Sequence, residues 1–190
     1  MSKAVLISIR PKWVEKIANG GKTIEVRKTK PKLETPFKCY IYCTLPKYPH
    51  EDFIATDYPM PQFYGGGKVI GEFTCDRIYK IDKDSTDFLF KFGRLSVYKQ
   101  AAEEKCGLCV AMTDDELHGY LGHCQGYGWH ISDLRIYDTP KELSEFKTLC
   151  RVDADCCACP YYNYTKMGCD GRVIGRPPQS WCYVDDVQAK

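Results

Sequence analysis

Apolar and polar residues alternate along several segments of this chain with the two-residue period of β-strands. Lys3–Ile9 is mostly apolar and predicts a buried strand, while Phe37–Thr44, Lys68–Ile81 and Tyr127–Tyr137 predict further strands. Gly71 within the third of these marks a bulge or a close approach of two backbones. Loops separate these strands more often than helices do. This order predicts an α+β fold in which a small mixed β-barrel is flanked by short helices.

Two short helices are predicted from local signals. Trp13, Val14 and Ile17 are apolar at helical spacing soon after the first strand, and Asn19–Gly21 (N-G-G) is a strong signal for the end of a helix. Later in the chain Thr113–Glu116 (T-D-D-E) is a capping box, which predicts the start of a second helix.

The strand that follows the first helix carries the main candidate site. Ile24 and Val26 lie on one face of this strand, so Glu25 and Arg27 share the other, with Lys22 just before them. A carboxylate beside a guanidinium and an ammonium indicates the wall of a polar cleft. In such a cleft the guanidinium binds a phosphate or a base edge, the carboxylate accepts from an exocyclic amine, and the ammonium binds phosphate. The alternative is a solvated surface ion pair between Glu25 and Arg27, worth roughly 0–1 kcal/mol.

Two further residues are candidates for ligand binding, from other predicted strands. Glu72 is a second acidic group on a strand, and Trp129 offers a stacking surface for a base. The alternatives are an outward-facing strand residue for Glu72 and a core residue for Trp129.

Composition and charge narrow the class of protein. The chain has 190 residues, of which 44% are hydrophobic and 13% aromatic, enough for one globular domain and a small appendage. The net charge of +2 is close to neutral, so any nucleic-acid binding requires a local basic patch. No window reaches the roughly 20 apolar residues of a membrane span, and the first residues do not resemble a signal peptide. A cytoplasmic protein without membrane contact is therefore expected. The basic residues gather early in the chain: Lys12, Lys16, Lys22, Arg27, Lys28, Lys30, Lys32 and Lys38.

Two groups among the twelve cysteines carry a prediction. Cys39 and Cys43 share one face of a predicted strand and are expected in the core. In the tail, a C-x-x-C pair and two single cysteines predict a structural zinc site, which would stabilise a segment poor in aliphatic residues. Cys150 and Cys157 are alternative ligands, an iron–sulfur cluster is an alternative to zinc, and a redox pair or free thiols are alternatives to any metal. The predicted ligands are Cys156, Cys159, Cys169 and Cys182.

The chain resembles the ASCH-domain proteins of the PUA-like superfamily. The resemblance rests on Ser8–Arg27, which includes G-x-K-x-x-E-x-R, and is supported by Val69–Glu72 and Gly128–Leu134. It implies a PUA-like β-barrel over residues 1–146, with a cleft between the first helix and the sheet that takes RNA or a modified base. Residues 147–190 resemble the cysteine-rich extension of bacterial and phage ASCH proteins. We expect this extension to pack back on the barrel through Trp181–Val184.

Three functions are compatible with these features. The first is binding of RNA, a nucleotide or a modified base through Lys22, Glu25, Arg27 and the weaker candidates, with a structural zinc in the tail. The second is an enzyme in the same cleft, a modified-nucleoside amidohydrolase or a ribonuclease, with Lys22 and Glu25 as catalytic residues. Some ASCH proteins hydrolyse acetylated cytidine with a lysine, a threonine and a glutamate, and their threonine position is Glu25 here. The third is a phage or host interaction module that uses the tyrosine- and proline-rich loop Leu45–Gly67.

Overall fold

The computed structural model describes residues 3–45, 53–55, 62–81, 109–122, 124–149, 162–163, 168–169 and 172–186. In these ranges no helix has the length and the apolar character needed to cross a membrane.

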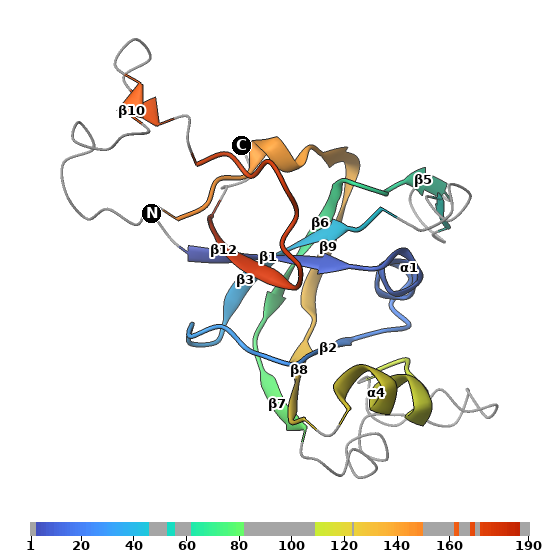
Figure 1. The fold of residues 1–190 in the computed structure, drawn as a ribbon. Helices are drawn as coiled ribbons and strands as arrows, with labels where there is room; N and C mark the ends of the chain where they lie inside the picture. The colour runs from blue at the N-terminus through green and yellow to red at the C-terminus, as the bar shows by residue number, and fades with distance from the viewer. Residues whose placement is uncertain are drawn as a thin grey trace.

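The larger of two main sheets has five strands in the order β12-β1-β3-β6-β9 (Figure 1). β1 and β3 are parallel, whereas the other neighbouring pairs are antiparallel, so the sheet is mixed. The strands are β1 (Lys3–Ile9), β3 (Phe37–Cys43), β6 (Val69–Cys75), β9 (Ser132–Lys141) and β12 (Trp181–Asp185).

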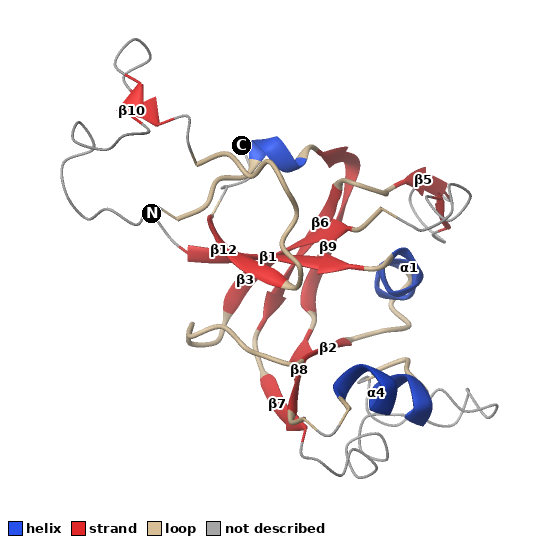
Figure 2. Ribbon diagram, viewed as in Figure 1, coloured by secondary structure: helices blue, strands red, loops and turns tan. Residues whose placement is uncertain are grey.

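The smaller main sheet has three antiparallel strands in the order β2-β8-β7. Figure 2 shows α1 and α4 lying on the same side of the strands, and the ion pair between Lys12 and Glu116 joins the two helices. The remaining elements are β2 (Ile24–Arg27), β7 (Ile78–Ile81), β8 (Gly126–His130), α1 (Pro11–Ala18), α4 (Asp114–Leu121), the 3₁₀ helix η2 (Leu143–Glu145), and the hairpins β4–β5 (Phe53–Ala55, Gln62–Tyr64) and β10–β11 (Tyr162–Asn163, Gly168–Cys169).

The predicted α+β class and the mixed sheet are confirmed, but the strands differ from the predicted barrel. Each of the predicted strands Lys68–Ile81 and Tyr127–Tyr137 is divided between the two sheets. The divisions lie side by side, because the N–H of His130 donates to the carbonyl of Arg77 at 2.9 Å. The backbone of Asp133 is left-handed, with φ +49°, where the chain enters β9. The strands therefore bend from one sheet into the other, and within the described ranges the two sheets do not join into a closed barrel.

β1 is buried on both of its faces, as its apolar sequence predicts. Val5 and Ile7 pack with Trp129 in the largest cluster, whereas Leu6 packs with Tyr40 on the opposite face of the sheet. The predicted core positions of the cysteines in β3 are confirmed, because the side chains of Cys39 and Cys43 are fully buried. β1 is thus a strand that packing holds on both of its faces.

The predicted helix boundaries and the return of the tail are also observed. α1 ends at Ala18, and Gly20 adopts a φ of +71° that favours glycine. Thr113 caps α4 and forms the predicted capping box with Glu116. In the extension, β12 pairs antiparallel with β1 at the edge of the larger sheet (Figure 1). This pairing places the residues just before β12 beside the C-terminal end of β1.

Candidate functional site

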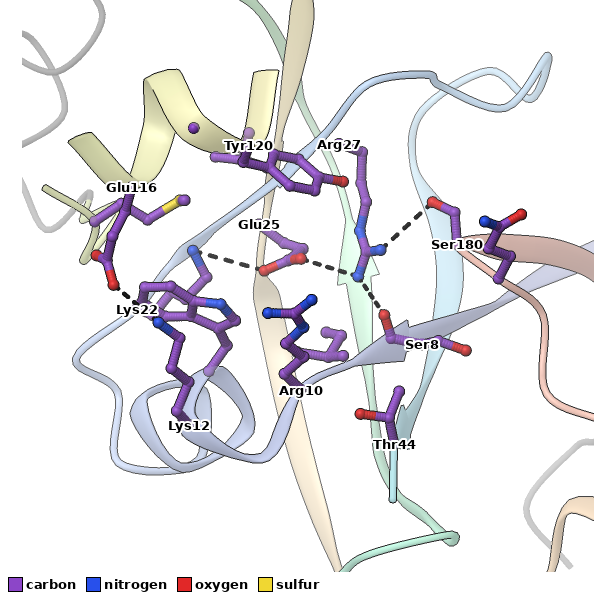
Figure 3. A pocket seen from close by; sticks show the side chains of 16 residues that line it. Ser8, Arg10, Lys12, Lys22, Glu25, Arg27, Thr44, Glu116, Tyr120 and Ser180 are labelled. Carbon is purple, nitrogen blue, oxygen red and sulfur yellow. Dashed lines mark hydrogen bonds and ion pairs between the residues drawn. The ribbon is translucent and has the colours of Figure 1, made fainter. Parts of the chain in front are cut away.

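A pocket of about 500 Å³ opens where α1, β2 and α4 meet the end of β1 (Figure 3). Its lining includes Lys22, Glu25 and Arg27, the three residues of the main candidate site. Gln179 and Ser180, which precede β12, complete the wall. Segments from both ends of the chain therefore form one concave surface.

Lys22, Glu25 and Arg27 form a buried chain of ion pairs. The carboxylate of Glu25 lies between the two cations, with Oε1 at 3.0 Å from Arg27 Nη2 and Oε2 at 3.6 Å from Lys22 Nζ. The three residues are only 2%, 5% and 6% exposed. Because solvent barely reaches them, the solvated surface ion pair considered as an alternative is not what the structure contains. We call this set the buried triad.

Arg27 is fixed by groups from both ends of the chain. Its Nη2 donates to the carbonyl of Ser8 at 2.6 Å, and its Nη1 donates to Oγ of Ser180 at 3.4 Å. The Ser8 hydroxyl in turn donates to the carbonyl of Pro178 at 2.6 Å. The Nε atom of Arg27 is buried and has no hydrogen-bond partner within the described part of the chain. The extension therefore holds the guanidinium in place, while one of its donors remains unused.

Lys22 is held at the base of the pocket by the segment that precedes α4. Nζ donates to the carbonyl of Val110 at 2.7 Å, and the N–H groups of Thr23 and Ile24 donate to the carbonyl of Cys109. Burial lowers the pKa of Lys22 below its ordinary value of 10.5; the carboxylate of Glu25 opposes this shift and Arg27 adds to it. The buried environment of Lys22 thus favours the neutral amine over the ammonium ion more strongly than solution in water would.

Because the pKa of Lys22 is lowered in the folded protein, the free energy of unfolding should depend on pH in the alkaline range. Between the folded-state pKa and 10.5, the unfolded chain binds a proton that the folded chain has lost. We therefore expect the free energy of unfolding contributed by this group to rise as pH rises through that window. Urea unfolding of the wild type and of Lys22→Met, measured between pH 7 and pH 10.5, isolates this contribution, because other groups titrate in both proteins. Identical pH slopes in the two proteins would contradict it.

Two aromatic side chains line the pocket beside the buried triad. The ring of Trp13 has the ammonium groups of Lys12, Lys16 and Lys22 at 4.3, 5.0 and 5.1 Å from its centroid. Tyr120 of α4 lies beside Arg27 in Figure 3 and is 37% exposed. Burial raises the pKa of Tyr120, an effect that Arg27 opposes, so its hydroxyl stays protonated as a donor. The pocket therefore combines two aromatic rings with the fixed charges of the buried triad.

The structure does not bring the two weaker candidates into this pocket. The carboxylate of Glu72 accepts a hydrogen bond from the hydroxyl of Tyr137 at 2.7 Å, and neither residue lines the pocket. Trp129 is fully buried in the core, with its ring 5.8 Å from that of Phe37 in an edge-to-face contact. The surroundings of Trp129 match the alternative of a core residue, whereas Glu72 is a half-buried strand residue that is paired with Tyr137 rather than facing outward alone.

The sequence analysis missed several lining residues, notably Tyr120, Gln179 and Ser180. Glu116 and Tyr120 are four residues apart and therefore share one face of α4, which was a usable local signal. The sequence does not show that this face of α4 lies beside β2, because the two elements are about 90 positions apart and local patterns carry no information on that contact.

Of the predicted zinc ligands, only Cys182 has a described side chain. It is half-buried on β12, and burial raises the pKa of its thiol. Cys169 lies in β11, and its side chain is not described; Cys156 and Cys159, like the alternatives Cys150 and Cys157, lie outside the described residues. In the part of the chain that is described, no three potential metal ligands are grouped. The zinc site remains a prediction.

Comparison with known proteins identifies the fold. No protein-family model and no curated protein matches the chain. The crystal structure of the ASCH protein from Zymomonas mobilis aligns with a TM-score of 0.56 at 16% identity, over 96% of this chain and 88% of that one. Two mutants of that protein give TM-scores of 0.53 and 0.55 at 17% identity, over 97% and 96% of this chain and 92% and 89% of theirs. At this identity the likeness shows the fold, and it confirms the resemblance drawn from the sequence motifs.

Proposed function

We propose that this chain, which has the PUA-like fold of the ASCH proteins, binds RNA or a nucleotide by taking one base into the pocket described above. The observation that carries the proposal is the buried triad in the wall of a pocket of about 500 Å³. That volume lies within the range of about 300–1,000 Å³ typical of small-ligand sites.

The energetics of the buried triad support a role in recognition. Taking three charged groups out of water is costly, and a buried ion pair is weak evidence for a purely stabilising role. Here the charges are also held by the carbonyls of Ser8 and Val110. A group already oriented and desolvated loses less on binding a ligand than a mobile one. The arrangement is therefore suited to reading polar atoms.

Within this site the three residues have different roles. Two Nη groups of Arg27 are occupied by protein acceptors, so Arg27 mainly orients Glu25. A carboxylate accepts about four hydrogen bonds, and only two cations contact that of Glu25. Glu25 therefore retains capacity for an exocyclic amine or a ring N–H of a base. Tyr120 supplies a face on which that base stacks.

Replacing Tyr120 with Ala is expected to weaken binding of single-stranded RNA by roughly 5- to 150-fold, since stacking contributes about 1–3 kcal/mol per base. Fluorescence anisotropy with labelled RNA of mixed sequence, at low and physiological salt, measures the change. Tyr120 is partly exposed, so its truncation leaves the core intact.

Tyr137→Phe is the matched control for this experiment. It removes a tyrosine hydroxyl that bonds to Glu72, outside the pocket. Its affinity should equal that of the wild type. Equal affinities of Tyr120→Ala and Tyr137→Phe, or no RNA binding by the wild type at low salt, would refute the proposal.

A second candidate is an enzyme in the same pocket, favoured by the lowered pKa of Lys22. A lysine with a lowered pKa can act as a general base nearer to neutrality, and the carboxylate of Glu25, at 3.6 Å, stabilises the ammonium that forms. Incubation with acetylated cytidine and with labelled RNA, beside Lys22→Ala, tests this candidate. Turnover no greater than that of the variant would end it.

We further propose that the extension binds a structural zinc ion. Support comes from the spacing of four soft thiolate donors in a segment with few core residues. Metal analysis of the purified protein should give one zinc per chain, and Cys159→Ser should lower that ratio. Iron with a visible charge-transfer band would instead indicate an iron–sulfur cluster.

A further inference from the structure

The pocket carries more positive than negative charge. Four cationic side chains and two carboxylates line it, which leaves an excess of two positive charges. Lys12 is neutralised by Glu116 at 2.9 Å, and the single carboxylate of Glu25 serves both other buried cations. A neutral base alone would leave this excess uncompensated.

Arg10 is the lining cation that lacks a carboxylate partner among the described residues. It is exposed at the junction of β1 and α1, and Figure 3 shows its guanidinium projecting into the pocket. A planar guanidinium with free donors at a pocket mouth matches the oxygens of a phosphate.

Two further donors near Arg10 are unused within the described ranges. The N–H of Lys12 has no partner, since the first helical hydrogen bonds to the carbonyl of Arg10 come from Trp13 and Val14. The hydroxyl of Thr44 makes no hydrogen bond, while its N–H donates to the carbonyl of Ile9 at 2.9 Å and so places it next to Arg10. Both residues line the pocket.

The start of α1 adds a favourable field at the same place. Its first turn contains no acidic residue, and Arg10 gives no side-chain cap to the helix. The positive end of the helix dipole therefore faces the mouth without a negative charge from the protein. Deeper in the pocket, the unpartnered Nε of buried Arg27 is a separate sign that the wall lacks an acceptor.

We propose that the ligand of this pocket is a nucleoside carrying a phosphate, whose oxygens bind Arg10, the backbone N–H of Lys12 and the hydroxyl of Thr44 while the base enters the pocket. The inference rests on the proposed function and adds a phosphate subsite, with the residues that form it. The phosphate belongs either to a free nucleotide or to an internal phosphodiester of RNA, and both offer the same oxygens.

Calorimetric titration with the four nucleosides, their 5′-monophosphates and short dinucleotides tests the inference and separates these sources. For the wild type we expect a monophosphate or a dinucleotide to bind at least tenfold more tightly than its nucleoside. In Arg10→Gln this ratio should fall to about one, and in Thr44→Val, which removes only a hydroxyl, it should fall severalfold. A gain for the dinucleotide alone would identify the internal phosphodiester as the source.

Lys3→Gln is the matched control, because it removes one positive charge at the opposite end of β1. Its ratio should equal that of the wild type. Nucleosides that bind as tightly as nucleotides, or a ratio that survives in Arg10→Gln, would overturn the phosphate site and leave base binding intact. Absence of binding to nucleosides, nucleotides and RNA alike would instead refute the proposed function, and the phosphate site with it.

Discussion

Replacing Glu25 with Gln is expected to lower the free energy of unfolding by about 3–5 kcal/mol. Glu25 is the only carboxylate that contacts Lys22 and Arg27 among the described residues, and all three are at most 6% exposed. The amide has nearly the same shape as the carboxylate but no charge. Two buried cations would therefore face each other without compensation.

A loss of this size should be plain in thermal unfolding. For a chain of this length each kcal/mol shifts the melting temperature by roughly 2–4 °C, so a fall of about 6–20 °C is expected. Glu116→Gln is the matched control, because its ion pair with Lys12 is partly exposed, unlike the buried triad, and the amide can still form the capping box. If the two variants lose the same small amount, the charges of the buried triad are not coupled as the distances indicate.

The cause of the loss can be tested within the same set of variants. If it arises from unpaired cations, adding Lys22→Met to Glu25→Gln should recover part of the stability, since one buried charge is then removed. Urea unfolding of the double variant measures this recovery. A double variant less stable than Glu25→Gln alone would mean that the packing of Lys22 matters more than its charge.

Local signals in the sequence predicted the elements around this site. The apolar run of β1, the N-G-G stop after α1 and the capping box at Thr113 each depend on a few neighbouring residues, and each is present in the structure. The alternation in β2 also separated the core-facing Ile24 from Glu25 correctly, since Ile24 packs in a buried cluster. Such features depend on backbone geometry and on burial of one face, which the sequence encodes directly.

Long-range features could not be predicted in this way. Alternation gives two faces for β6 and β8 but does not show which face meets the pocket, and so Glu72 and Trp129 were candidates that the pocket does not include. The predicted strand that begins at Tyr127 is divided at Ile131, where the chain passes from the smaller sheet into the larger one. Apolar and polar residues continue to alternate through this point, so the pattern does not reveal the division. The contribution of Ser180 depends on β12 pairing with β1, which joins positions more than 170 residues apart.

Gly71 is a position at which a prediction from the sequence matches a long-range contact in the structure. The sequence predicted a bulge or a close backbone approach there, and the pairing of β6 with β9 shifts register beside it. A Cβ atom at this position would lie 2.4 Å from the carbonyl oxygen of Arg135 and 3.2 Å from Cα of Ile136. Both neighbours are backbone atoms of a paired strand, which cannot rotate away.

Gly71→Ala is therefore expected to cost roughly 3 kcal/mol, the upper end of the range for overpacking. The matched control is Gly119→Ala, because a Cβ there meets nothing within 4 Å and the residue is exposed on α4. Alanine forms helix better than glycine, so that variant should gain up to about 1 kcal/mol. Urea unfolding of both variants should thus move in opposite directions from the wild type. A Gly71→Ala protein as stable as the wild type would show that β6 and β9 can separate without loss, and that the larger sheet is not the rigid support on which the pocket depends.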